Sequence, residues 1–393
     1  MKITQMELLL LKGAEPFSHN GFSPLVVRLT TDEALVGYGE LSMAIGNSQN
    51  EAIGAVRDLA PMIIGCDFRD STRLWWKMSR ENLWALGGGC ALYAAISAID
   101  TALWDLKAKW LEVPLYQLLG GKLREEFPCY ASQLQFGWES GADKAVTGEE
   151  LARQASVALE QGYRWIKFDP FGYSADGIWK GWSLRGALST EAVQEIQARV
   201  AAVRSTVGKE MQIIIENHCL TDAQSAVLLI RALEEYRIDY FEEVCVPGNV
   251  ALWEDVRRRT SVGLCTGEKV VTRNGFLPYI INRTVDMIQP DIGICGGITE
   301  ILPICAMAEM YDVAVSLHTC HSPISIATSL QIEAVLPNFC IHEVHKSAIL
   351  EPNIALGSEP LCPKDGKYSL PAGSGIGMGL SAWALKNCER LIF

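Results

Sequence analysis

The segment IIIENH, residues 213–218, joins three isoleucines directly to the polar side chains of Glu216, Asn217 and His218. A short apolar run of this kind is typical of a strand that is buried on both faces. Similar runs recur from residue 129 onward, in the order CYASQLQ, WIKFD, IIIENH, YFEE, GLCTGE, MIQPD, VAVSLH and CIHEV. Helical stretches such as EELARQASVALEQG separate most of them, and this alternation predicts an α/β protein with a closed barrel of parallel strands.

Ionisable side chains lie at the ends of successive predicted strands. In a (β/α) barrel the carboxyl ends of the strands meet at one mouth, where catalytic groups lie. One polar strand end is usually only a solvated terminus, but such a succession predicts a functional site. In chain order these ends carry Lys167 and Asp169, Glu216 and His218, Glu242 and Glu243, Glu268, Asp291, His318, and Glu343.

Three of these carboxylates, Glu216, Glu242 and Glu268, end adjacent strands and are candidate metal ligands. Hard oxygen ligands suit Mg²⁺, with water or substrate in the remaining coordination positions. Zinc prefers histidine and cysteine, which the segment HTCH at residues 318–321 offers. We therefore predict a Mg²⁺ site, and zinc at the HTCH segment is the alternative.

Asp291 and His318 end successive strands and form a candidate general base. An aspartate hydrogen-bonded to one imidazole nitrogen fixes the tautomer and raises the basicity of the other nitrogen. Together with a metal, such a base suits removal of the proton α to a carboxylate, and His218 is left as a separate acid for a departing β-hydroxyl. The alternative is that either histidine only makes structural hydrogen bonds.

The first 127 residues have a different, mixed pattern. The stretch LVVRLTTDEALVGYGE, residues 25–40, predicts a hairpin, and residues 91–110 have apolar side chains at helical spacing. The start, MKITQMELLLLKG, is interpreted as a first strand and not as a signal peptide, because its apolar run is short and no small-residue cleavage site follows.

The composition excludes several classes of partner. A net charge of −12 argues against a nucleic-acid partner, because phosphate binding needs a basic surface. No stretch approaches the ~18 apolar residues of a membrane helix. The 12 cysteines are scattered without a C-x-x-C pair, which predicts free thiols in a reducing cytoplasm.

Taken together, the barrel segments resemble the enolase superfamily, in its mandelate racemase branch, and most closely the acid-sugar dehydratases of galactonate type. The resemblance is carried by AAISAIDTALWDLKAKW at residues 94–110 and by WIKFDPFG, FEEV, TGEKVVTR, IQPDIGICGGITE and VSLH. It implies a modified TIM barrel of (β/α)7β type at residues 128–369 and an N-terminal α+β capping domain at residues 1–127. A C-terminal segment from about residue 370 to 393 would complete the capping domain, and the resemblance also suggests a homo-oligomer.

The same resemblance implies a role for each strand-end residue. His318, oriented by Asp291, would remove the α-proton, and His218 would protonate the leaving 3-hydroxyl group. The remaining implied roles are metal ligation by Glu216, Glu242 and Glu268, a catalytic charge beside the substrate carboxylate from Lys167, and substrate binding by Glu343 and Asp169.

Several positions depart from the pattern of the family that the chain resembles. Asp169 stands where the racemases carry a second lysine base, and its presence favours dehydration over two-sided proton exchange. Glu216 replaces the aspartate of the most similar dehydratases. Cys219 and Leu220 follow His218 where those enzymes have Gly-Arg, so one cation of the site is absent.

Substrate specificity is expected from the N-terminal region. The segment EPFSHNGFSP, residues 15–24, is predicted to act as a lid in which His19 and Asn20 contact the substrate, and a polar connection between strands is the alternative. Trp75, Trp76 and Trp84 are expected to pack in the core and not to stack on a sugar.

The sequence thus predicts a cytoplasmic, Mg²⁺-dependent hydro-lyase that converts a small sugar acid, an aldonate or aldarate, to a 2-keto-3-deoxy acid. Two alternatives remain open: a cycloisomerase or epimerase that acts through the same enolate, and a paralogue that has the fold without turnover. One sequence does not specify the stereochemistry of the sugar acid.

Overall fold

Eight parallel strands form one curved sheet in the computed structural model, which describes residues 1–13, 22–44, 48–138, 144–171, 173, 184–186 and 188–393. Their order in the sheet is β10-β9-β8-β7-β6-β5-β4-β11. All the strand runs predicted from residue 129 onward are found. The strands are β4 (Glu126–Ser132), β5 (Trp165–Phe168), β6 (Gln212–Glu216), β7 (Tyr240–Glu242), β8 (Gly263–Thr266), β9 (Met287–Ile288), β10 (Ala314–Val315) and β11 (His342–His345).

The two edges of this sheet are joined by main-chain hydrogen bonds. Strand β11 pairs in parallel with β4. Beside β10, the Val315 N–H donates to Asn338 O at 2.9 Å, and the Cys340 N–H donates to Val315 O at 2.8 Å. Because residues 338–340 lead directly into β11, these contacts close the sheet into a barrel. A further strand, β12 (Lys367–Ser369), pairs antiparallel with β4 on the outside of this path.

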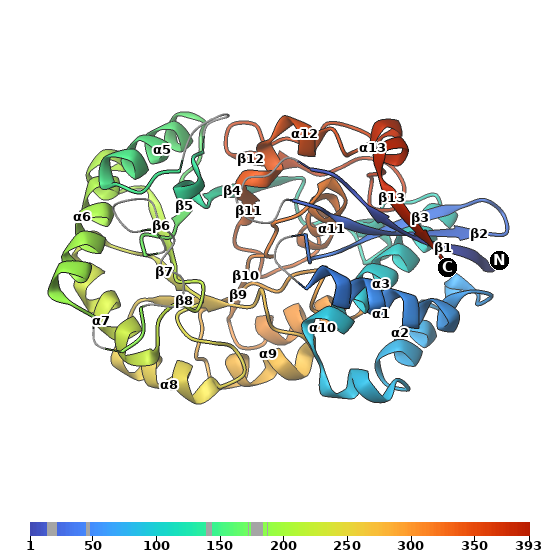
Figure 1. Cartoon of the computed structure of the whole chain (residues 1–393), viewed down its shortest axis with the longest axis horizontal. Coiled ribbons are helices and arrows are strands. Elements are labelled where there is room, and N and C mark those ends of the chain that lie inside the picture. The colour runs from blue at the N-terminus through green and yellow to red at the C-terminus, as the bar shows by residue number, and fades with distance from the viewer. Residues whose placement is uncertain (14–21, 45–47, 139–143, 172, 174–183, 187) are drawn as a thin grey trace.

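One helix connects each strand of the barrel to the next, which is the predicted (β/α)7β order. Figure 1 shows α5 to α9 following one another around the outside of the strands. The connecting helices are α5 (Gly148–Glu160), α6 (Thr190–Val207), α7 (Ala223–Leu233), α8 (Val250–Arg259), α9 (Thr272–Ile281), α10 (Ile298–Glu309) and α11 (Pro323–Glu333).

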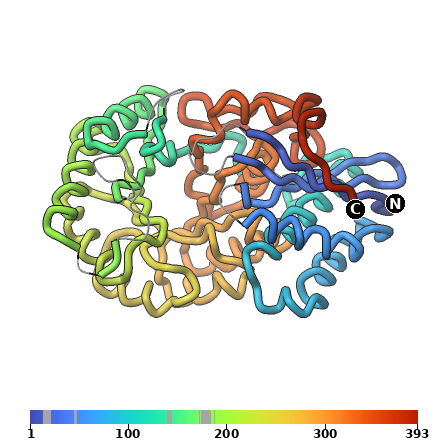
Figure 2. Tube along the Cα trace, in the orientation of Figure 1, coloured from blue at the N-terminus to red at the C-terminus, as the bar shows by residue number. Residues whose placement is uncertain are grey.

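An antiparallel sheet and three helices form the N-terminal capping region. The sheet order is β13-β1-β2-β3, so the last strand of the chain pairs with the first, as Figure 2 shows at the two marked termini. The predicted hairpin is present, with Thr30 opposite Val36. The exact domain boundaries stay a prediction. The elements are β1 (Ile3–Leu10), β2 (Leu25–Thr31), β3 (Val36–Leu41), β13 (Glu389–Ile392), α1 (Gln49–Ile63), α2 (Ser71–Ser79) and α3 (Cys90–Trp110).

Helix α3 lies against β3 at unusually short range. A side chain at Gly39 would place its Cβ 2.0 Å from the Ala98 carbonyl oxygen, and one at Gly37 would lie 2.3 Å from that of Ala102. Glycine in the strand and alanine on the helix therefore permit this approach. The short helices α4 (Leu115–Leu118), α12 (Glu351–Ile354) and α13 (Ala382–Asn387) complete the description, and no described helix is long and apolar enough to cross a membrane.

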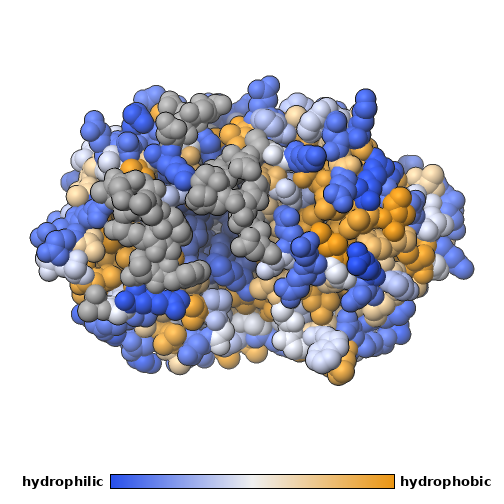
Figure 3. All heavy atoms as spheres, viewed as in Figure 1, coloured by the Kyte–Doolittle hydropathy of each residue, from blue (hydrophilic) through white to orange (hydrophobic). Residues whose placement is uncertain are grey.

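The tryptophan prediction is wrong in part. Trp75 is buried in the capping core, but Trp76 is 52% exposed and Trp84 is 81% exposed. Hydrophobic residues also gather over the capping region on the face shown in Figure 3. Exposed apolar side chains of this size are often covered by subunit contacts. They favour the homo-oligomer implied by the resemblance, which stays a prediction.

Candidate active site

Three carboxylates, two of them buried and that of Glu268 partly exposed, meet at the mouth of the barrel. Glu216 and Glu242 are the last residues of β6 and β7, and Glu268 follows β8 by two residues. One oxygen from each lies within 4.8 Å of one from each of the others. Glu216 Oε2 is buried and accepts no hydrogen bond in the part of the chain that the structure describes. An all-oxygen donor set, in which this buried oxygen has only the ion pair with Lys167 at 3.1 Å among the described residues, fits a hard divalent cation.

Lys167, on β5, is the positive charge inside this cluster. Its side chain is buried, and Nζ lies 2.5 Å from Glu242 Oε1, 3.0 Å from Glu343 Oε1 and 3.1 Å from Glu216 Oε2. Burial lowers the pKa of this ammonium group, but the charges of Glu242 and Glu343 outweigh burial and raise it well above its usual range. Lys269 Nζ also contacts Glu268, so two ammonium groups face the four carboxylates Glu216, Glu242, Glu268 and Glu343, and negative charge is left for a bound cation.

The pKa values of two of these carboxyls move in opposite directions. Burial and the charge of Glu216 raise the pKa of Glu242 well above its usual range. Burial would also raise the pKa of Glu216, but the charges of His218 and Lys167 lower it well below that range. Like charges held this close favour either a shared proton or a counter-cation.

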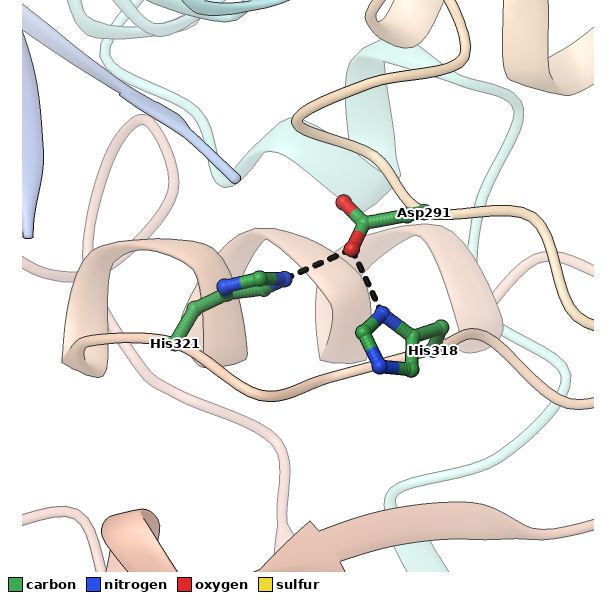
Figure 4. A group of neighbouring side chains, drawn as sticks. All are labelled: Asp291, His318 and His321. Carbon is green, nitrogen blue, oxygen red and sulfur yellow. Dashed lines mark hydrogen bonds and ion pairs between the residues drawn. The ribbon is translucent and has the colours of Figure 1, made fainter. Parts of the chain in front are cut away.

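Asp291 and His318, after the next two strands, form the predicted histidine–aspartate dyad of the general base. His318 Nδ1 lies 2.7 Å from Asp291 Oδ2 (Figure 4), and since a carboxylate only accepts, Nδ1 carries the proton. His318 Nε2 is left facing the mouth, 3.3 Å from Glu268 Oε2. Burial lowers the pKa of this imidazole, but the charges of Glu268 and Asp291 outweigh it and raise the pKa of His318 to about 10.

His321 shares the same aspartate, as Figure 4 shows. Its Nε2 lies 2.6 Å from Asp291 Oδ2, so that oxygen accepts from two imidazoles. Both nitrogens point at this oxygen and not at a common empty position, which fits a hydrogen-bonded triad better than the zinc site considered for the HTCH segment. Asp291 is fully buried, and its other oxygen accepts from Ser42 Oγ at 2.5 Å and from the Gly293 N–H at 2.8 Å.

A second histidine–aspartate pair lies at the ends of β5 and β6. His218 Nδ1 is 2.8 Å from Asp169 Oδ2, and Gln133 Nε2 is 3.3 Å from His218 Nε2. Burial lowers the pKa of His218, but Glu216 and Asp169 outweigh burial and raise it to about 8. These neighbours favour the protonated imidazole, which suits a general acid.

The local backbone at His218 differs from the strand expected there. The strand ends at Glu216, and both His218 (φ 46°) and Cys219 (φ 57°) adopt left-handed conformations. The His218 N–H donates back to Glu216 Oε1 at 2.8 Å. The side-by-side placement of Glu216 and His218 therefore comes from a tight turn and not from the alternation of side chains along a strand.

The remaining predicted residues are also placed, with two exceptions. Glu343 is buried, accepting from Ser132 Oγ at 2.6 Å and from the Thr319 N–H at 3.0 Å. Glu243 pairs with Lys269 at 3.1 Å and accepts from Cys219 Sγ at 2.8 Å, so the unexpected cysteine has a partner. His19 and Asn20 lie outside the described residues. The roles of all these residues stay proposals.

Several residues of the site could not be recognised from the sequence. Ser42 reaches it from a segment that carries no motif, Gln133 lies in the run CYASQLQ but was not singled out, and Gln289 donates to the candidate metal ligand Glu242 at 2.5 Å. His321 was visible only as part of the HTCH segment. Contacts between residues this far apart in the chain become evident only in the folded structure.

Comparison with known families matches nearly the whole chain. Residues 150–384 match the family described as enolase C-terminal domain-like, and residues 19–120 match the N-terminal domain of mandelate racemase / muconate lactonizing enzyme. The chain is a member of the enolase superfamily. A solved structure of a member of the enolase superfamily from Salmonella Typhimurium aligns with a TM-score of 0.96 and 39% identity, covering 100% of this chain and 99% of that one.

Two curated relatives within the enolase superfamily are dehydratases by name. The chain is 30% identical to D-gluconate dehydratase of Thermoproteus tenax, over 98% of this chain and 73% of the relative. It is 31% identical to D-galactonate dehydratase of Xanthomonas campestris pv. campestris, over 81% of this chain and 77% of the relative. The family prediction is confirmed, and the predicted enzyme class, a hydro-lyase, is that of both relatives.

Proposed function

We propose that this member of the enolase superfamily is a Mg²⁺-dependent dehydratase of a sugar acid that forms a 2-keto-3-deoxy acid. The observation that carries the proposal is the presence of two histidine–aspartate pairs, His318–Asp291 and His218–Asp169, at one carboxylate-lined mouth. Elimination of water needs one group to remove a proton and another to deliver one. The dehydratase names of the relatives agree with this reading.

His318 is the base in this proposal. Its Nδ1 proton is held by Asp291, so Nε2 accepts the proton from the carbon atom α to the substrate carboxylate. The charge of Glu268 is a main cause of the raised pKa of His318. Glu268 would be one of the residues that hold the cation, which would offset its charge and leave Nε2 of His318 free to accept the proton.

Glu216, Glu242 and Glu268 would hold the Mg²⁺ ion. When bound, this ion supplies the positive charge that stabilises the enediolate formed by loss of the α-proton. Lys167 adds a buried ammonium group beside the same carboxylates, where it opposes the charge that the substrate carboxylate brings into the mouth.

His218 is the acid. Asp169 holds Nδ1 of His218 and favours the protonated imidazole, so its Nε2 proton passes to the 3-hydroxyl group as the C3–O bond breaks and water leaves. The resulting enol then takes a proton and becomes the 2-keto-3-deoxy acid. Asp169 occupies the place at which a lysine would act as a second base, and its engagement with His218 favours dehydration over epimerisation.

A substrate screen tests this function. Purified protein with Mg²⁺ is incubated with a stereochemically complete library of four-, five- and six-carbon sugar acids, and 2-keto acid is detected. We expect turnover of one or a few stereoisomers. Exchange of the C2 proton with solvent deuterium but no 2-keto product would indicate an epimerase or cycloisomerase, and intact metal binding without any turnover would indicate a non-catalytic paralogue.

A further inference from the structure

The loop that carries Asp291 is held mainly by the capping region. Three capping elements contact residues 293–299, the segment that follows Asp291 and includes the first residues of α10. Trp75 Nε1, on α2, donates to Gly296 O at 2.8 Å. On α3, Ser97 Oγ accepts from the Gly296 N–H at 2.9 Å, and Asp100 accepts from the Thr299 N–H at 2.8 Å.

The end of β3 makes the contact nearest to the base. Ser42 Oγ donates to Asp291 Oδ1 at 2.5 Å, and the Ser42 N–H donates to Gly293 O at 3.2 Å. Gly293 permits this approach, because a Cβ at that position would lie 2.1 Å from Ser42 Oγ. Ser42, Gly293 and Asp291 are thus packed so closely that the serine hydroxyl has a defined partner.

The same strand also holds the segment that carries both histidines. Glu40, two residues before Ser42, accepts from the Ser322 N–H at 3.0 Å, from Ser322 Oγ at 2.6 Å and from the Ser325 N–H at 3.1 Å. Ser322 directly follows His321, at the start of α11. The end of β3 therefore contacts both halves of the base, the aspartate loop and the histidine segment.

We propose that Ser42 is a positioning residue that fixes the orientation of the Asp291 carboxylate, so that the capping region completes the general base of the barrel. Oδ1 is held by Ser42 and Gly293, which leaves Oδ2 directed at His318 and His321. Without the Ser42 hydroxyl, one of the two bonds to Oδ1 is lost and the carboxylate is free to rotate away from His318. The function of this arrangement rests on the dehydratase activity proposed above.

The test compares Ser42→Ala with Ser97→Ala as a matched control. Ser97 is also a buried capping serine whose hydroxyl bonds to the same loop, but it does not contact Asp291. Loss of an orienting partner typically costs about 10- to 100-fold in activity. We expect Ser42→Ala to lower kcat by about 10-fold or more, to slow C2 proton exchange by the same factor and to leave KM within about twofold. Ser97→Ala should leave kcat, the rate of C2 proton exchange and KM within about twofold of the wild-type values.

A spectroscopic measurement on the Mg²⁺-loaded proteins separates positioning from turnover. The low-field proton resonance of His318 Nδ1–H, assigned by its absence in His318→Asn, should shift or broaden in Ser42→Ala and stay unchanged in Ser97→Ala. Thermal unfolding of both serine variants verifies that they are folded.

An unchanged resonance with unchanged C2 exchange in Ser42→Ala would overturn the proposal, as would equal effects of the two serine substitutions. If the wild-type protein turns over no sugar acid, the proposed function fails, but the His318 resonance still decides whether Ser42 positions Asp291.

Discussion

At the scale of single residues, each site histidine keeps one nitrogen for an aspartate and the other for the mouth of the barrel. Nδ1 of His318 and Nδ1 of His218 lie 2.7 and 2.8 Å from their carboxylate partners. The surroundings of Nε2 differ, since Glu268 is beside His318 and Gln133 is beside His218. Two similar pairs can therefore serve as base and acid in one reaction.

Replacing Asp169 tests the second of these pairs. Asp169→Asn removes the negative charge that holds the proton on His218, so dehydration should fall by about 10- to 100-fold. Exchange of the C2 proton depends on His318 and should stay within a few-fold of the wild-type rate. Both rates are measured in deuterated buffer by NMR. Asp291→Asn is the matched control and should lose both activities, and equal loss in the two variants would contradict separate roles.

The sequence predicted the candidate catalytic residues better than the residues that hold them in position. Glu216, Glu242, Glu268, Asp291 and His318 could be found because each lies at the end of a strand or within three residues after it, at a regular interval. Ser42 could not, because its contact with Asp291 spans 249 positions and leaves no pattern in the chain. The pairing of Asp169 with His218 was also missed, since it depends on two consecutive left-handed residues, His218 and Cys219.

At the scale of elements, the contact between α3 and α10 joins the capping region to the barrel. Asp100, fully buried on α3, accepts from the Thr299 N–H at 2.8 Å and from Thr299 Oγ1 at 2.7 Å, at the start of α10. A carboxyl in this position satisfies backbone N–H groups that a helix start leaves without intrahelical partners. Burial is the largest effect on this group and raises the pKa of Asp100 to about 7.

This raised pKa predicts a pH dependence of stability. Between about pH 4 and pH 7 the folded protein keeps a proton on Asp100 that the unfolded chain has lost. The contribution of Asp100 to the unfolding free energy is therefore greatest below that window and falls as pH rises through it. In Asp100→Asn, which does not titrate, the loss of unfolding free energy from pH 5 to pH 7 should be smaller by on the order of 2 kcal/mol. Denaturant unfolding measures this, and parallel pH curves for the two proteins would contradict the raised pKa.

The elements themselves were largely predictable, but their contacts were not. Apolar runs and helical spacing located every barrel strand, even β9 and β10, which have only two residues each. The approach of α3 to β3 depends on Gly37 and Gly39, whose role is visible only once the helix is placed against them. Trp76 and Trp84 were misjudged because aromatic content alone does not tell which face of an element is covered.

At the scale of the whole molecule, the carboxylate cluster predicts that a divalent cation stabilises the fold. Glu216, Glu242 and Glu268 are brought together only in the folded protein, so an ion that binds them stabilises that state by mass action. At a free concentration of about 100 times its dissociation constant, the ion should add roughly 2.7 kcal/mol to the unfolding free energy. Thermal unfolding with Mg²⁺ and with EDTA measures the effect.

A variant with one ligand removed controls this experiment. Glu268→Gln retains the size of the side chain but removes one charged ligand, and the shift caused by Mg²⁺ should shrink or disappear. A melting temperature that is the same with Mg²⁺ and EDTA in the wild-type protein would contradict a metal site at these carboxylates.

The barrel and its capping region were predictable because their patterns extend over long stretches of the chain. Strand and helix alternate from residue 129 onward, and the resemblance to the enolase superfamily extends across both parts of the chain. The identity of the sugar acid is a different matter. It depends on side chains that line the mouth, among them the predicted contacts His19 and Asn20, which lie outside the described residues.

In the proposed reaction His318 removes the α-proton and His218 protonates the departing hydroxyl group. The most direct test follows both events in deuterated buffer for His218→Asn, with His318→Asn as the control, on a sugar acid that the wild-type protein dehydrates. We expect His218→Asn to exchange the C2 proton still, while its dehydration rate falls by at least about 100-fold. We expect His318→Asn to lose both C2 exchange and dehydration. Simultaneous loss of exchange and dehydration in a folded His218→Asn protein would contradict this assignment of roles.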